Sequence, residues 1–160
     1  MHYTLLQGRH RTINGAFHIV EVVGIYLAAR GMRLSRPLMA FRVPAGFPSP
    51  AQDEIAGRID LNRDLVKHPL ATFYVRVEGD SMEPRIHSGE LLVVDRMAET
   101  KDGDVVVERL GCEFTVKRLH TEEDGRIQLV SENPSYEPIQ ITEGMDFEVW
   151  GRVMYSIHRH

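Results

Sequence analysis

The sequence predicts a mostly β fold, in which a single β-rich domain follows a flexible N-terminal tail. From residue 72 onward, short segments rich in β-branched and aromatic residues follow one another along the chain. Turn-forming stretches separate them, among them HSGE, KDGD, LGCE, EEDG and ENPS. Short segments at this spacing are typical of antiparallel sheets, so we expect a mostly antiparallel body.

Composition indicates the size and class of the protein. A chain of 160 residues with 42% hydrophobic residues, 26% charged residues and a mean hydropathy of -0.25 is typical of one soluble globular domain. The net charge of -4 is unevenly distributed along the chain. Residues 1–45 hold six arginines and a single acid, Glu21, which gives this tail a charge of +5. The other 115 residues therefore carry a charge of -9. A basic tail can bind nucleic acid, but we expect this one to lie against its own acidic body.

The most apolar N-terminal segment is AFHIVEVVGIYLAARGM, residues 16–32. His18 and Glu21 interrupt it, and it is too short for the roughly 20 apolar residues of a membrane helix, so we expect no membrane span. Its other large side chains recur at helical spacing, at Ile19, Val22, Val23, Tyr26 and Leu27. This pattern predicts a short amphipathic helix, or a strand that docks on the body or on a partner.

The next two segments differ in their proline content. VPAGFPSPAQD, residues 43–53, resists helix formation, because each proline fixes its own φ and holds the residue before it extended. We therefore expect an exposed strand or linker there. The following segment, DEIAGRIDLNRDLVKHP, predicts one or two helical turns that end before Pro69.

The body then consists of six predicted strands. TFYVRVE shows the clearest alternation, with Phe73, Val75 and Val77 facing one way. The six segments cover residues 72–78, 90–95, 104–110, 113–119, 126–130 and 147–157. The lone cysteine, Cys112, excludes an internal disulfide and suits a reducing, cytoplasmic compartment, where a buried or turn-adjacent thiol is expected.

Two residues of the body are candidates for catalysis. Ser81 lies in a Gly-Asp-Ser turn after the first predicted strand, and Lys117 lies among apolar neighbours in FTVKRL. An ordinary turn serine and a solvent-facing lysine would explain each residue alone. A desolvated lysine, however, has a lowered pKa, and its neutral amine can activate a serine hydroxyl as a nucleophile.

No metal or cofactor is expected from the sequence. The eight histidines are scattered, and only His158 and His160 lie close together in the chain. Two isolated histidines near a terminus are not a metal-ligand pattern.

Four ordered motifs resemble the UmuD/LexA family of self-cleaving Ser/Lys proteins, peptidase family S24. They are AGFPSPAQD, GDSMEPRIHSGELLVVDR, GDVVVE and EFTVKRL, and the likeness covers residues 42–155. FPSP, RIDLN and HPLATFYV resemble the UmuD branch most closely. The order and spacing also agree, because Ala45 lies 36 positions before Ser81 and Ser81 lies 36 positions before Lys117.

The resemblance implies a role for each matched residue. Ser81 would attack the carbonyl of Ala45, and Lys117 would act as general base and then protonate the leaving amine of Gly46. Backbone N–H groups of Ser81 and Met82 would stabilise the oxyanion. Residues 1–45 would then be the tail removed by self-cleavage, and residues 46–160 the autoprotease and dimerisation domain.

The resemblance also implies a biological setting. UmuD-like proteins are latent SOS-response proteases that the RecA filament on single-stranded DNA stimulates. The shortened product forms a homodimer and joins a UmuC-like Y-family polymerase for translesion synthesis. Residues 1–31 resemble nothing in the family, so we expect either that they are an added docking segment or that the natural start is Met32.

Three alternatives use the same motifs. A LexA-type or phage repressor needs an N-terminal helix-turn-helix unit of about 60 residues, which does not fit a tail broken by Pro37 and Pro44, so no sequence-specific DNA binding is expected. A signal peptidase shares the GDSM serine and a lysine but requires a membrane anchor. A non-enzymatic β module would use Ser81 and Lys117 structurally.

Overall fold

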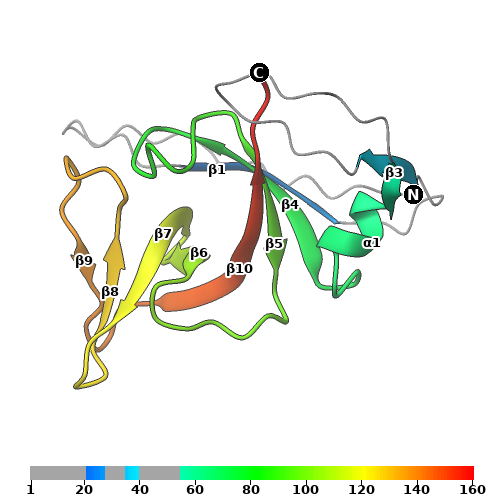
Figure 1. Ribbon diagram of the computed structural model, residues 1–160. Helices are drawn as coiled ribbons and strands as arrows, with labels where there is room; N and C mark the ends of the chain where they lie inside the picture. Colours follow the sequence, from blue (N-terminus) through cyan, green and yellow to red (C-terminus); the bar gives the residue numbers. More distant parts are fainter. Residues whose placement is uncertain (1–20, 28–34, 40–54) are drawn as a thin grey trace.

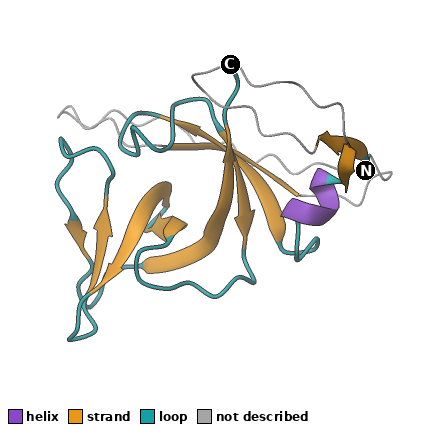
Figure 2. Cartoon of the chain, viewed as in Figure 1, coloured by secondary structure: helices purple, strands orange, loops and turns teal. Residues whose placement is uncertain are grey.

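The protein is described by a computed structural model that covers residues 21–27, 35–39 and 55–160 (Figure 1). Strands form most of this structure, with one short helix beside them (Figure 2). The strands of the larger sheet are β1 (Glu21–Leu27), β4 (Thr72–Glu78), β5 (Leu91–Asp95), β6 (Val105–Leu110), β7 (Glu113–Thr121), β8 (Ile127–Val130), β9 (Ile139–Gln140) and β10 (Phe147–Ile157). A mostly β fold is therefore confirmed.

The larger sheet is antiparallel and curves back on itself. Its strand order is β1-β4-β5-β10-β6-β7-β8-β9. A further pairing joins Glu21 of β1 to Thr115 of β7, so the first six strands in this order form a closed ring. In Figure 1, the long β10 curves between β5 and β6, its two neighbours in this ring. The register shifts along β10 allow this bend.

All six strands predicted in the body are confirmed, within a residue or two at their ends, as β4, β5, β6, β7, β8 and β10. The short β9 was not expected. It has two residues, and Ile139 pairs with Leu129 of β8. A strand of two residues produces no periodic pattern in the sequence, so only its pairing with β8 identifies it as a strand.

Residues 21–27 take the strand alternative predicted for the apolar N-terminal segment. β1 pairs antiparallel with β4 from Glu21 opposite Glu78 to Leu27 opposite Phe73. The helical alternative is wrong for these residues. The segment contains the β-branched Val22, Val23 and Ile25, which lose side-chain freedom in a helix, and β4 offers an edge for backbone pairing.

A small second sheet lies beside the helix. β2 (Arg36–Met39) pairs with β3 (Ile55–Ile59), and α1 (Leu61–Leu65) follows directly. The helical turn predicted in residues 53–69 is thus confirmed for 61–65, where Asp60 caps the N-terminus by accepting a hydrogen bond from Asn62 N. Residues 55–59 are extended instead, because they pair with β2.

The core comprises two clusters on opposite faces of the β6–β7 pair. Val107 and Val116 belong to the first cluster, whereas Val106 and Leu119 belong to the second. The first cluster also contains two residues of the turn after β4, Met82 and Ile86. No helix in the described ranges is long and apolar enough to cross a membrane.

Candidate active site

A tight turn after β4 holds Ser81. Gly79 begins this turn with φ +99°, a backbone conformation that side-chain-bearing residues rarely adopt. Asp80 O then accepts a hydrogen bond from Glu83 N at 3.1 Å, and Met82 O accepts one from Ile86 N at 2.9 Å. Met82 and Ile86 are both buried in the core and anchor the turn, and Ser81, which directly precedes Met82, is fully buried.

Lys117 approaches the same hydroxyl from β7. Its Nζ lies 2.9 Å from Ser81 Oγ, within hydrogen-bond distance, although the two residues are 36 positions apart in the chain. The lysine is 3% exposed. Burial lowers the pKa of Lys117 to about 8, because the charged ammonium loses its hydration. At mildly alkaline pH this amine is therefore neutral and can accept the Ser81 proton.

A second buried charge, Glu108 on β6, lies near this pair. Its side chain is fully buried, and Oε1 accepts a hydrogen bond from Thr115 Oγ1 at 2.5 Å. Burial raises the pKa of the Glu108 carboxyl, while the hydrogen bond from Thr115 and the charge of Lys117 oppose that rise. The sequence interpretation missed Glu108. The signal was an acid that directly follows the three valines of the predicted strand DVVVERL.

The loop after β8, residues 131–136, holds the serine turn from the other side. Asn133 N donates to Ser81 O at 3.0 Å, and Asn133 Nδ2 donates to Asp80 O at 3.2 Å. The hydroxyl of Tyr136 donates to the Asp80 carboxylate. These bonds fix the backbone on which Ser81 sits. The sequence interpretation identified this stretch only as a turn, since the contacts span more than 50 positions of the chain.

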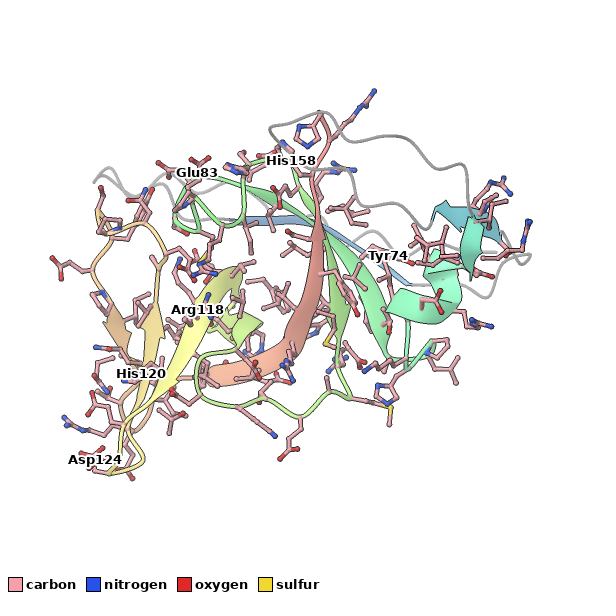
Figure 3. All side chains as sticks on the ribbon, in the orientation of Figure 1. Tyr74, Glu83, Arg118, His120, Asp124 and His158 are labelled. Atoms are coloured by element: carbon pink, nitrogen blue, oxygen red, sulfur yellow. The ribbon has the colours of Figure 1, made fainter. Side chains whose placement is uncertain are left out.

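Glu132 of the same loop joins the serine turn to β7. One carboxylate oxygen lies 2.7 Å from Nε of Arg118, a β7 residue labelled in Figure 3, and the other lies 3.2 Å from Nε of Arg85 in the serine turn. Arg118 directly follows Lys117 in β7. The carboxylate therefore ties together the two elements that carry Ser81 and Lys117.

The structure brings Ser81 and Lys117 together, and it places Met82 directly after the serine within the turn that Gly79 begins. The predicted scissile residues Ala45 and Gly46 lie outside the described residues, as does the predicted boundary between tail and body. The catalytic, oxyanion and cleavage-site assignments therefore stay predictions.

The remaining candidates are placed as follows. The rings of His158 and His160 lie 4.8 Å apart by centroid, and His158 Nδ1 contacts Glu90 Oε1 at 3.0 Å. In the ranges that the structure covers, no group of three or more His, Cys, Asp and Glu residues is arranged to hold a metal ion. Cys112 is turn-adjacent as expected, but it is exposed rather than buried.

Comparison with known proteins extends these observations. The peptidase S24-like family matches residues 37–154, a range that includes Ser81 and Lys117. Protein SamA of Salmonella typhimurium strain LT2 is 44% identical over 124 residues, which cover 77% of this chain and 85% of SamA. Protein MucA of Escherichia coli is 41% identical over 79% of this chain and 86% of MucA. The LexA repressor of Dechloromonas aromatica strain RCB is 40% identical over 78% of this chain, but only 63% of that repressor is covered.

Proposed function

Because this chain belongs to the peptidase S24-like family, as a UmuD-like self-cleaving serine protease of SOS mutagenesis, we propose that Ser81 cuts the chain's own Ala45–Gly46 bond. The observation that carries this proposal is the 2.9 Å contact between Lys117 Nζ and Ser81 Oγ. Both side chains are buried, so the contact is desolvated. A buried lysine on a serine hydroxyl has a direct chemical use in acyl transfer.

The proposed reaction proceeds in two stages. The neutral amine of Lys117 takes the proton of Ser81 Oγ, which attacks the carbonyl carbon of Ala45. Backbone N–H groups of Ser81 and Met82 stabilise the resulting oxyanion. The Lys117 ammonium then returns the proton to the Gly46 nitrogen, the peptide bond breaks, and an ester joins Ala45 to Ser81. Water, activated by Lys117, hydrolyses this ester and regenerates the serine.

The chemistry of the bond supports this assignment. Ala45 and Gly46 are small, and Pro44 and Pro48 favour an extended backbone without placing a proline nitrogen in the bond itself. Since substrate and catalyst belong to one chain, attack is intramolecular and benefits from a high effective concentration. Each molecule therefore turns over once.

The family also suggests partners. We assign the stimulus to the RecA filament on single-stranded DNA, and the polymerase partner of the shortened product to a UmuC-like Y-family enzyme. The product, residues 46–160, would act as a cytoplasmic homodimer. The relatives SamA and MucA come from bacteria, which is consistent with this setting.

The proposal is tested by incubating the purified chain at pH 9 and measuring intact masses and N-terminal sequences. We expect a new N-terminus at Gly46, and no cleavage in Ser81→Ala or Lys117→Ala. Ser156→Ala and Lys101→Ala are matched controls, because both residues are exposed. These two variants should cut at the unmodified rate. Cleavage at another bond would refute the Ala45–Gly46 assignment, and full activity of Ser81→Ala would refute the nucleophile.

A further inference from the structure

We infer that the buried carboxyl of Glu108 governs the protonation state of Lys117 and thereby restrains self-cleavage at neutral pH. This inference rests on the proposed function of Ser81 and Lys117. It assigns Glu108 as a positioning residue, which acts on the reaction through the lysine and does not touch the substrate.

The pairing of β6 with β7 places the two charges next to each other. Val106 lies opposite Lys117, and Glu108 lies opposite Thr115. Because strand residues two apart share a face, Glu108 and Lys117 are diagonal neighbours on one face, at a typical separation of about 7–8 Å. Glu108 is fully buried and Lys117 is 3% exposed, so their interaction is only weakly screened by water.

The hydrogen bonding of Glu108 is incomplete. Oε1 accepts from Thr115, but the buried Oε2 has no hydrogen-bond partner among the described residues. Buried carboxylates are normally satisfied at both oxygens, since desolvation is costly. In this protein, the charge of Lys117 offsets part of that cost.

Other charged groups around Glu108 and Lys117 either pair with other residues or lie on other faces of the sheet. On β10, the residue opposite Glu108 is the apolar Val149. Arg109, the next residue of β6, faces away from Glu108 and pairs with Asp146 and Glu148.

Two further acids lie on neighbouring elements. Glu21 of β1 is paired through its backbone opposite Thr115. Asp80, in the serine turn, accepts its hydrogen bond from Tyr136. Within the described part of the chain, Glu108 is the charge that acts on the pKa of Lys117, and Lys117 is the charge that acts on the pKa of Glu108.

Two arrangements are possible while the pair holds one proton, and the base is also free once that proton is lost at alkaline pH. With an ammonium on Lys117 and a carboxylate on Glu108, the base is occupied and Ser81 cannot be activated. With a neutral amine and a protonated Glu108, the base is available. Burial favours the second arrangement, because it lowers the pKa of Lys117 to about 8 and raises that of Glu108, whereas the mutual attraction favours the first. The carboxylate of Glu108 therefore stabilises the ammonium form of Lys117, in which the lysine cannot act as a base.

The test is the pH–rate profile of self-cleavage in Glu108→Gln. We expect its midpoint to fall by about one pH unit, and the rate at pH 7 to rise about fivefold, because the lysine loses its stabilising negative charge. Glu113→Gln is the matched control, since Glu113 lies exposed on β7. Its profile should coincide with that of the unmodified chain.

A second measurement avoids cleavage altogether. In the Ser81→Ala background, NMR titration of the Lys117 Cε and Nζ signals should give a lower midpoint when Glu108→Gln is added. If Glu108→Gln does not fold, Thr115→Val should lower the midpoint by a smaller amount, because it removes the hydrogen bond that favours the carboxylate.

The outcomes separate this inference from the proposed function. A fully active Lys117→Ala would overturn the proposed function itself. An inactive Lys117→Ala together with an unchanged midpoint in Glu108→Gln, or in Thr115→Val where that variant is used, would overturn only the role of Glu108.

Discussion

Lys117 combines deep burial with a basic side chain, two properties that rarely occur together in proteins. It is 3% exposed, and its pKa falls from 10.5 to about 8 because the ammonium is desolvated. Each pKa unit corresponds to about 1.4 kcal/mol, so burying this amine costs about 3 kcal/mol of stability below about pH 8. The cost disappears between about pH 8 and 10.5, where the unfolded chain binds the proton more strongly than the folded one.

The same shift predicts how self-cleavage depends on pH. The base acts only when neutral, so the rate should rise about tenfold per pH unit below a midpoint near pH 8 and level off above it. Rates are measured from pH 6 to 10.5 by mass spectrometry, with Ser81→Ala at each pH to detect hydrolysis that does not involve the site. A flat profile, or a midpoint above pH 10, would contradict this prediction.

At the scale of elements, β10 must bend sharply because it joins β5 to β6 within the closed ring (Figure 1). Gly151 lies at one of its register shifts. A Cβ atom there would lie 2.8 Å from Val94 Cγ1 and 3.3 Å from Arg96 Cγ. Glycine is therefore required at this position for close packing of β10 on β5.

Gly151→Ala should accordingly destabilise the protein by about 1–3 kcal/mol, because a core side chain and a strand must shift. The free energy of unfolding in urea measures this effect. Gly57→Ala is the matched control, since a Cβ at that strand position meets nothing within 4 Å. If both variants unfolded at the same urea concentration, crowding at Gly151 would be excluded as a constraint.

In the whole molecule, strands from the two sides of the predicted scissile bond pair with each other. β1 precedes the predicted scissile bond in sequence, yet it pairs with β4 at six positions and closes the ring against β7. Cleavage between residues 45 and 46 would break the covalent link between β1 and the body, but it would leave these backbone hydrogen bonds in place.

We therefore expect the fragment 1–45 to stay bound to the body after cleavage. Native mass spectrometry of an incubated sample should detect both pieces in one complex, and moderate urea should release the fragment before the body unfolds. A body free of fragment in native buffer would contradict the prediction.

The proposed homodimer is tested on the same sample by light scattering, which measures the mass of the assembly. The exposed Tyr155 and Ile157 of β10 offer apolar surface for this dimer. A monomer mass at micromolar concentration, for both intact and cleaved chains, would exclude that dimer.

Local patterns in the sequence determined the β class, the six strands of the body and the candidate pair of Ser81 and Lys117, because alternation, turn residues and short motifs are properties of neighbouring residues. Only the tertiary structure decided that residues 21–27 form a strand, since their apolar spacing suits a helix equally and the edge of β4 selects the extended form. Tertiary structure also decided where Glu108 and the loop after β8 lie relative to Ser81 and Lys117. Their effect on the site depends on burial and on contacts between residues far apart in the chain, which no local pattern records.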